Sequence, residues 1–261
     1  MTPDYAAYMS AARQAALQAG AFLREQFHAV KLVDESLQHD VKLRLDKDAQ
    51  NLIASSLLAA FPQSCILGEE GNAGASCAEY QWIVDPIDGT VNYFYGIPIF
   101  CVSIALQHRG QLVLGCVYDP MQGECFEAIA GQQALLNGQP IAVSSRSAMR
   151  EAVVFIGHGT HDGSGEAGIR RFAHLSRQVR KIRILGSAAL TLCYIAAGRF
   201  DAYVEGRICL WDFAAARVIL EAAGGALEFE ARPGDEIRGA IVAWNGRIPL
   251  HEALQMDTSL S

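Results

Sequence analysis

The sequence of 261 residues carries little charge and no excess of basic residues. Charged residues make up 19% of it, and 28 acidic residues against 21 basic ones give a formal net charge of −7. This balance excludes a general nucleic-acid binder, which needs a dominant basic face. Hydrophobic residues make up 51%, which excludes a disordered chain.

The sequence also lacks a disulfide pattern and a membrane-spanning segment. Its seven cysteines include no C-x-x-C pair, and their number is odd, so we expect free thiols in a reducing cytoplasm. The long uncharged stretches 89–107 and 184–198 are interrupted by polar residues or too short to span a bilayer. The first residues show no basic region followed by an apolar one, so we predict no signal peptide and a soluble, cytoplasmic protein.

Two halves with different patterns meet near residue 144. The first half is predicted to combine helices with an antiparallel meander: helices over 4–27 and 46–60, strands over 65–67, 81–84, 100–107, 111–118 and 124–129, and a turn at 137–138. In the second half, strands over 152–156, 182–185, 201–204, 226–230 and 240–244 alternate with helices over 165–177, 188–197 and 213–223. Such alternation is typical of a mostly parallel sheet covered by helices. We therefore predict an α+β half, 1–143, fused to an α/β half, 144–261.

The segment Trp-Ile-Val-Asp-Pro-Ile-Asp-Gly-Thr over 82–90 delivers two carboxylates at the end of an apolar strand. Pro86 fixes φ and removes a donor, so we expect the chain to turn there. Asp85 and Asp88 can then converge on one hard divalent cation, above all Mg²⁺. The two backbone amides that follow would face an anion at the start of a helix. The structural alternative is an Asx turn with two solvated aspartates.

Two further segments offer acids. Leu-Gly-Glu-Glu-Gly over 67–71 ends a short apolar strand, so Glu69 is a candidate third ligand, and a surface loop is the alternative. In Cys-Leu-Trp-Asp-Phe over 209–213, Asp212 stands at the start of an Ala-rich helix. It is either a further ligand or a helix cap.

These segments, G-E-E, W-I-V-D-P-I-D-G-T-V-N-Y and W-D-F-A-A-A…E-A-A-G-G, resemble in their order and spacing the inositol monophosphatase family. The resemblance covers nearly the whole chain, including G-S-A-A over 186–189 and D-A-Y-V-E ending at Glu205. It implies a layered α-β-α-β-α sandwich. It also implies a Mg²⁺-dependent, lithium-sensitive phosphomonoesterase that acts on a small phosphorylated substrate and is commonly a homodimer.

The resemblance implies roles for individual residues. A first Mg²⁺ would be bound by Glu69, Asp85 and the carbonyl of Ile87. A second would be bound by Asp85, Asp88 and Asp212. The phosphate would be held by the N–H groups of Gly89 and Thr90. The attacking water would be oriented by Glu69 and by Thr90, the latter backed by Asp46. The alcohol part of the substrate would be contacted by Asp88, Gly186, Ala188 and Glu205.

The sequence departs from the family pattern before the second helix. The family's D-x-V-T-x-x-D segment reads Asp-Val-Lys-Leu-Arg-Leu-Asp over 40–46, so its threonine is missing. Glu35 is the residue nearest to the place of a family lysine. The sequence therefore leaves undecided whether a third, weaker Mg²⁺ site exists. Lys42 is a candidate for the missing positive charge.

Other motifs have weaker interpretations. Gly-Ser-Gly-Glu-Ala-Gly over 163–168 matches G-x-G-x-x-G, but no acid follows at the distance that a dinucleotide site needs. His158 and His161 are expected in a loop rather than on zinc. The basic residues within 170–183 form either a solvated helix face or an attractive surface for an anionic substrate.

We therefore predict hydrolysis of a small phosphate monoester, above all inositol monophosphate, because Glu205 can accept hydrogen bonds from ring hydroxyls. The alternative substrates are 3′-phosphoadenosine 5′-phosphate, fructose 1,6-bisphosphate and histidinol phosphate. The alternative of another class is a non-catalytic anion-binding or regulatory protein on the same fold.

Overall fold

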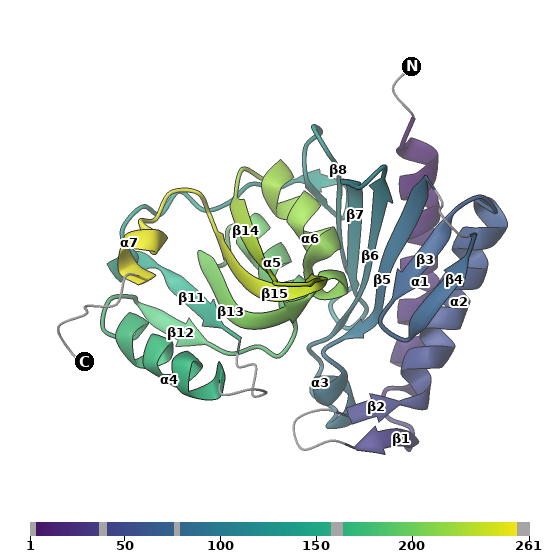
Figure 1. Cartoon of the computed structure of the whole chain (residues 1–261), viewed down its shortest axis with the longest axis horizontal. Helices are drawn as coiled ribbons and strands as arrows, with labels where there is room; N and C mark the ends of the chain where they lie inside the picture. The colour runs from purple at the N-terminus through teal and green to yellow at the C-terminus, as the bar shows by residue number, and fades with distance from the viewer. Residues whose placement is uncertain (1–3, 37–40, 76–78, 158–163, 255–261) are drawn as a thin grey trace.

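The computed structural model describes residues 4–36, 41–75, 79–157 and 164–254, and its helices and sheets stack in five layers (Figure 1). One helix pair covers an eight-stranded sheet, and a second pair lies between this sheet and a five-stranded one. Two more helices cover the far side of the smaller sheet. Separate apolar clusters fill the spaces between the layers. The expected α-β-α-β-α sandwich is confirmed.

Helices α1 (Ala6–Gln26) and α2 (Arg44–Ala60) form the first layer, close to their predicted bounds. α1 is rich in alanine, the strongest helix former, and its small side chains let the helix lie close against the sheet. Leu23 and Phe100 are fully buried in the cluster beneath it. Burying one such side chain stabilises the fold by about 1.5–3 kcal/mol.

The eight-stranded sheet has the order β10-β9-β8-β7-β6-β5-β3-β4. Its strands are β3 (Cys65–Gly68), β4 (Gly71–Gly74), β5 (Tyr80–Asp88), β6 (Cys101–His108), β7 (Gln111–Asp119), β8 (Glu124–Ile129), β9 (Leu135–Leu136) and β10 (Gln139–Pro140). The predicted antiparallel meander is confirmed from β6 to β10, and β3 pairs with β5 in parallel. The sequence did not predict β4, nor β1 (Val33–Ser36) and β2 (Val41–Leu43), which pair with each other.

Strand β5 continues through Pro86, so the expected end of the strand there is wrong. Asp85 pairs with Ser103 and Asp88 with Cys101, so that three steps along β5 face two steps along β6. This is a β-bulge with one extra residue, a place where a sheet tolerates proline. In a regular strand, residues three apart would face opposite sides. The extra residue therefore turns Asp85 and Asp88 to the same side of the sheet.

The five-stranded sheet has the order β12-β11-β13-β15-β14. Its strands are β11 (Val153–Ile156), β12 (Lys181–Arg183), β13 (Ala202–Cys209), β14 (Ala226–Arg232) and β15 (Asp235–Trp244). It is mixed, as expected, but β11 alone is parallel to both of its neighbours, whereas β15 is antiparallel to both of its own. Half of the pairings are thus parallel, not most. The tight Pro233-Gly234 turn explains one of the two antiparallel pairings, that of β14 with β15, because a hairpin must return antiparallel.

The remaining helices cover both faces of the smaller sheet: α4 (Ser164–Leu175), α5 (Ala188–Ala196), α6 (Leu210–Ala222) and α7 (Leu250–Leu254), with a 3₁₀ turn η1 over Met149–Glu151. α5 and α6 lie between the two sheets (Figure 1) and are apolar on nearly every side, as a buried helix must be. No helix in the described ranges is long and apolar enough to cross a membrane. The boundary between halves at residue 144 stays a prediction.

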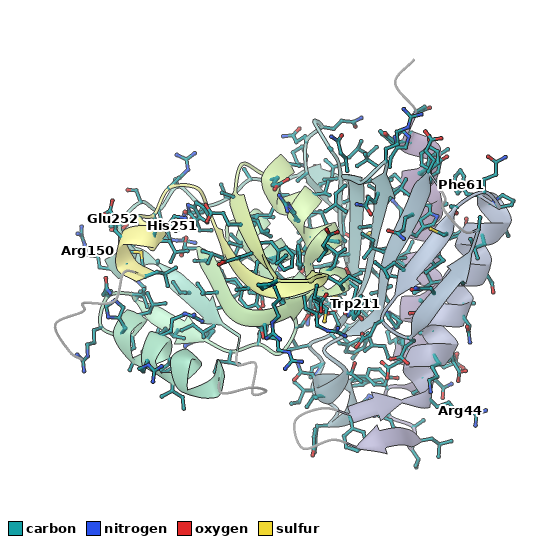
Figure 2. The ribbon with its side chains drawn as sticks, viewed as in Figure 1. Arg44, Phe61, Arg150, Trp211, His251 and Glu252 are labelled. Atoms are coloured by element: carbon teal, nitrogen blue, oxygen red, sulfur yellow. The ribbon has the colours of Figure 1, made fainter. Side chains whose placement is uncertain are left out.

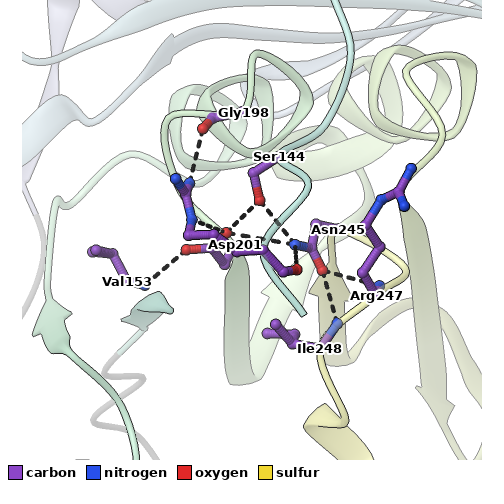
Figure 3. A network of polar contacts seen from close by, with 8 residues as sticks. Ser144, Val153, Gly198, Asp201, Asn245, Arg247 and Ile248 are labelled. Atoms are coloured by element: carbon purple, nitrogen blue, oxygen red, sulfur yellow. Dashed lines mark hydrogen bonds and ion pairs between the residues drawn. The ribbon is translucent and has the colours of Figure 1, made fainter. Parts of the chain in front are cut away.

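A buried polar network holds together the start of the second half (Figure 3). The fully buried carboxylate of Asp201 accepts hydrogen bonds from Ser144 Oγ at 2.5 Å and from Arg146 Nε at 2.7 Å. It also accepts the N–H of Val153 at 2.8 Å. Asn245 donates to Ser144 Oγ and to the carbonyl of Arg146, both at 2.9 Å. The network therefore joins the entering segment to β11, β13 and the end of β15.

Asp201→Ala is expected to lower the free energy of unfolding by about 3–5 kcal/mol, the usual result of breaking a buried ion pair. The variant leaves Arg146 without its carboxylate and the N–H of Val153 without its acceptor. Urea unfolding followed by circular dichroism measures the change. Asp235→Ala is the control, because Asp235 pairs with Arg238 at the surface, where an ion pair contributes little to stability. A loss for Asp201→Ala no larger than that of the control would contradict this role of the network.

Candidate active site

Every predicted site residue except Asp46 lines one cavity of about 410 Å³, which lies where the two halves of the sandwich meet. β5 and α3 (Thr90–Phe94) supply its wall from the first half, and α5, β13 and α6 supply its wall from the second. Figure 2 shows Trp211 at this junction, one residue before Asp212. The volume is in the range of small-molecule sites, about 300–1,000 Å³.

Asp88 is held by the start of α5. Its Oδ2 accepts Ser187 Oγ at 2.6 Å and the N–H of Ala189 at 2.7 Å. Its Oδ1 accepts the N–H of Ala188 at 3.1 Å, and Cys101 Sγ lies 3.5 Å from Oδ2. The carboxylate thus caps a helix of the other half of the chain. Asp88 also lines the cavity.

Asp46 and Asp212 occupy equivalent positions on their helices. α2 begins at Arg44 and α6 at Leu210, so each aspartate is the third helical residue rather than the cap that opens the helix. Oδ2 of Asp46 accepts the N–H of Leu43 at 2.8 Å, and Oδ2 of Asp212 accepts the N–H of Cys209 at 2.8 Å. Each carboxylate thus satisfies a backbone donor at its helix N-terminus with one oxygen.

The carboxylates in the cavity repel one another. Burial raises the pKa of Asp85 well above its usual range, and the charges of Glu69, Asp88 and Asp212 raise it further. Burial raises the pKa of Asp212 well above its usual range, and the charges of Glu69 and Asp88 raise it further. Burial also raises the pKa of Asp88, but the hydrogen bonds from Ser187 and the α5 backbone oppose the shift. A positive charge between these groups would relieve the repulsion.

The donor set fits a hard divalent cation. Carboxylate oxygens and a backbone carbonyl, such as that of Ile87, are the ligands that such ions prefer. Ile87 lies inside the bulge, where its N–H binds Asp85 Oδ1 at 3.0 Å. Glu69 approaches from the turn between β3 and β4, with its N–H on the carbonyl of Val84 at 3.2 Å. The four carboxylates and this carbonyl line the same cavity.

Gly89 and Thr90 form the start of α3. Gly89 has a φ of 103°, and a Cβ there would lie 3.0 Å from the carbonyl of Ile99 and 3.1 Å from that of Gly186. Only glycine fits this position. The hydroxyl of Thr90 donates to the carbonyl of Ile87 at 2.9 Å and lies 3.4 Å from Asp46 Oδ1. The structure therefore brings Asp46 to the rim of the site through Thr90.

Glu205 stands on the opposite wall, where it is hydrogen-bonded to the hydroxyl of Tyr203. The pKa of Glu205 is raised to about 7. Burial is the main cause, the bond from Tyr203 opposes the rise, and the charge of Asp88 adds to it. The side chain fits because position 157 is glycine: a Cβ on Gly157 would lie 2.1 Å from Glu205 Oε2.

Sequence reasoning missed several residues of the cavity. Asn92 donates to the carbonyls of Ile99 and Leu185, both at 2.9 Å, and so joins α3 to the segment before α5. Ser187 and Tyr203 were also missed. Asn92 lies two residues beyond the aspartate-rich motif, which was a usable signal, whereas nothing local marks Ser187 as a partner of Asp88.

A second group of ligand-type side chains lies elsewhere. Cys116, Cys125 and Glu127 bring their ligand atoms within 4.8 Å of one another. Among the described residues, no three carboxylates of the cavity have oxygen atoms that lie this close together. The guanidinium of Arg13 already pairs with both oxygens of Glu127. The hydrogen bond between Cys116 and Cys125, together with burial, raises the pKa of Cys116, so it stays a thiol. Every cysteine in the described ranges is free, as expected.

Some sequence predictions concern residues that are not described. His158, His161 and Gly163 lie outside the described residues, as do the side chains of Glu35 and Lys42. The third metal site and the glycine motif over 163–168 therefore stay predictions.

Comparison with known proteins identifies the family and the fold. Residues 4–253 match the pattern of the inositol monophosphatase family. The chain belongs to this family. An inositol-1-monophosphatase of Rhizobium meliloti (strain 1021) is 37% identical over 251 residues, which are 93% of this chain and 94% of that protein. A fructose-1,6-bisphosphatase/inositol-1-monophosphatase of Thermotoga maritima is 35% identical over 80% of this chain and 79% of its own length.

Solved structures agree with this family assignment. The crystal structure of the extragenic suppressor protein suhB from Bartonella henselae has a TM-score of 0.88 at 32% identity, covering 96% of this chain and 99% of that one. Membership in the inositol monophosphatase family makes the chain a phosphatase for a small phosphorylated substrate. This outcome confirms the predicted enzyme class.

Glu205→Gln is expected to stabilise the metal-free protein increasingly as pH rises. The folded-state pKa of about 7 lies above the ordinary 4.5, so the contribution of Glu205 is complete below about pH 4.5 and is lost as pH rises through 7. Between pH 5 and 8.5 the variant should gain about 2–3 kcal/mol relative to the wild type. Urea unfolding in EDTA measures this, with the exposed Glu230→Gln as control. A difference that does not change with pH would contradict the buried position of Glu205.

Proposed function

We propose that this member of the family is a Mg²⁺-dependent phosphomonoesterase whose main substrate is inositol monophosphate. The observation that carries the proposal is the convergence of Glu69, Asp85, Asp88 and Asp212 on one cavity beside the start of α3. In the proposal, Glu69, Asp85 and the Ile87 carbonyl hold one ion, and Asp85, Asp88 and Asp212 hold a second. Two such ions, when bound, stabilise both the attacking and the leaving oxygen of an in-line displacement.

The phosphate is assigned to the backbone at Gly89 and Thr90. The first N–H groups of a helix have no partner within the helix, and they favour negative charge. Support comes from position 89, where neighbouring carbonyls leave no room for a Cβ, so that the residue there carries no side chain that could cover these donors. Gly89 and Thr90 therefore bind and orient the phosphate.

The attacking water is assigned to Glu69 and Thr90. A hydroxyl has one hydrogen, which Thr90 shares between the carbonyl of Ile87 and Asp46. If the Ile87 carbonyl were taken up by a bound ion, the Thr90 hydroxyl would donate its hydrogen bond to Asp46 alone. Its lone pairs would then accept a hydrogen bond from the water. Asp46 thus fixes the orientation of Thr90.

The alcohol part of the substrate is assigned to the wall formed by Asp88, Gly186, Ala188 and Glu205. A polyol is favoured because Glu205 accepts hydrogen bonds and because no described residue that lines the cavity offers a Lys or Arg side chain to a second phosphate. Bisphosphates stay the second candidate, since the relative from Thermotoga maritima carries fructose-1,6-bisphosphatase in its name.

Three further properties belong to the proposal. We infer inhibition by lithium and a cytoplasmic location, the latter supported by the free thiols. We also infer a homodimer, supported by apolar side chains at the surface: Tyr95 is 71% and Ile184 61% exposed. Light scattering at micromolar concentration tests the dimer.

Asp85→Asn is expected to lower Mg²⁺-dependent phosphate release at least about 10³-fold without unfolding the protein, because Asp85 would serve both ions. Inorganic phosphate is measured with inositol 1-phosphate after removal of metal and addition of Mg²⁺. Mg²⁺ should also raise the Tm of the wild type and not that of the variant. The matched control is Asp119→Asn, a buried aspartate that accepts the N–H groups of Met121 and Gln122 outside the cavity. Near-normal turnover of folded Asp85→Asn would exclude the proposed metal site.

The same assay ranks substrates. Inositol 1-phosphate is compared with 3′-phosphoadenosine 5′-phosphate, fructose 1,6-bisphosphate and histidinol phosphate. The largest kcat/KM is expected for inositol 1-phosphate, and a larger value for any other compound would replace it as the proposed substrate.

Asp46→Asn and Thr90→Ala are expected to lower kcat roughly 10²–10⁴-fold each, the usual range for help in proton transfer, with little change in the Mg²⁺ requirement. Because the two residues act as a unit, the double variant should be scarcely slower than either single one. Small, additive effects on kcat would instead leave Asp46 with only its role at the N-terminus of α2.

A further inference from the structure

The side chain of Gln50 lies directly under the turn that carries Glu69. Gln50 is only 7% exposed, and its amide rests on the backbone of Gly68. A Cβ at position 68 would lie 2.2 Å from Gln50 Oε1 and 2.5 Å from its Cδ. The two residues are therefore sterically complementary: the amide of Gln50 occupies the space that a side chain at position 68 would need.

The amide pairs with the turn as a strand would. Gly68 and Gly71 are the last pair of the β3–β4 hairpin, so Glu69 and Glu70 form its two-residue turn. Gln50 Oε1 accepts the N–H of Glu70 at 3.0 Å, and Gln50 Nε2 donates to the carbonyl of Gly71 at 2.9 Å. On the other side, the N–H of Glu69 is bound to the carbonyl of Val84. The turn that carries Glu69 is thus held from two sides, by Val84 through Glu69 and by Gln50 through Glu70 and Gly71.

The hairpin is anchored through β3, which pairs with β5, whereas its other strand is open to solvent. β4 is the edge strand of its sheet, and all four of its residues are exposed. When ionised, Glu69 is repelled by the charges of Asp85 and Asp212. The exposed strand β4 offers little burial to resist this repulsion. Two hydrogen bonds from a buried amide to the turn contribute to that resistance.

We propose that Gln50 is a positioning residue that sets the place of Glu69 at the metal site. The inference rests on the proposed function in one respect, the role of Glu69 as a metal ligand. Asp46 and Gln50 are four residues apart on α2 and so lie on the same face of the helix. One turn of α2 thereby fixes Thr90 through Asp46 and Glu69 through Gln50.

The test compares two replacements of similar length. Gln50→Met fills the space without hydrogen bonds, whereas Gln50→Glu keeps an acceptor for the N–H of Glu70. The matched control is Gln178→Met, a half-buried glutamine that donates to the carbonyl of Ala253 far from the cavity. Two readouts are taken for each: the Mg²⁺ concentration at half-maximal phosphate release, and the dependence of Tm on Mg²⁺.

Gln50→Met is expected to raise the half-maximal Mg²⁺ concentration about 10–100-fold, the usual effect of losing a residue that orients a metal ligand. KM for the phosphate ester at saturating Mg²⁺ should stay near that of the wild type. Gln50→Glu should need less Mg²⁺ than Gln50→Met, and Gln178→Met should match the wild type. A Mg²⁺ requirement of Gln50→Met within twofold of the wild type, or an equal requirement in Gln50→Met and Gln50→Glu, would overturn the role.

The Tm readout separates this inference from the proposed function. If wild-type Tm rises with Mg²⁺ and no phosphate ester is hydrolysed, the proposed reaction is wrong, and the Tm series still decides the role of Gln50. A Tm dependence on Mg²⁺ that is equal in the wild type and Gln50→Met overturns that role even if the enzyme is active.

Discussion

Negative charge gathered between two sheets is the constraint on which the rest of the site depends. Asp85 and Asp212 are buried beside other carboxylates, where the low dielectric constant strengthens their repulsion. Backbone N–H groups stabilise this charge. The first N–H groups of α5 donate to Asp88. The N–H groups just before α2 and α6 donate to one oxygen of Asp46 and of Asp212, respectively. These helices therefore fill the interior with apolar side chains and also hold negative charge in a fixed geometry.

The bulge in β5 and the junction of the two halves set that geometry. The extra residue in β5 turns Asp85 and Asp88 to one side of the sheet, the side that α5 and α6 cover. Asp88 then reaches the start of α5, and Asp212 arrives on the first turn of α6. Neither half alone contains the complete cavity, because its walls come from β5 and α3 on one side and α5, β13 and α6 on the other.

Local chemistry was readable from the sequence, and long-range pairing was not. The helices, the meander and the acid-rich motif over 82–90 follow from periodicity and turn residues, and the motifs identified the family correctly. The continuation of β5 through Pro86 could not be foreseen, because the bulge exists only against β6. The antiparallel place of β15 depends on which strand it joins after its hairpin. The contact of Gln50 with the turn after Gly68 links residues 20 apart in the chain, and no local signal marks it.

The split of the cavity between the halves has a consequence for the order in which the chain is made. Strands β3 to β10 leave the ribosome first and can form the larger sheet, but α5 and α6, which cover its inner face, are synthesised later. Until then Asp88 lacks its donors and an apolar sheet face lies open, a state prone to aggregation. The nascent chain gains its last carboxylate, Asp212, on the same helix that closes this face. The helix that supplies this carboxylate to the hydrolytic site is therefore also the helix that covers the inner face of the larger sheet.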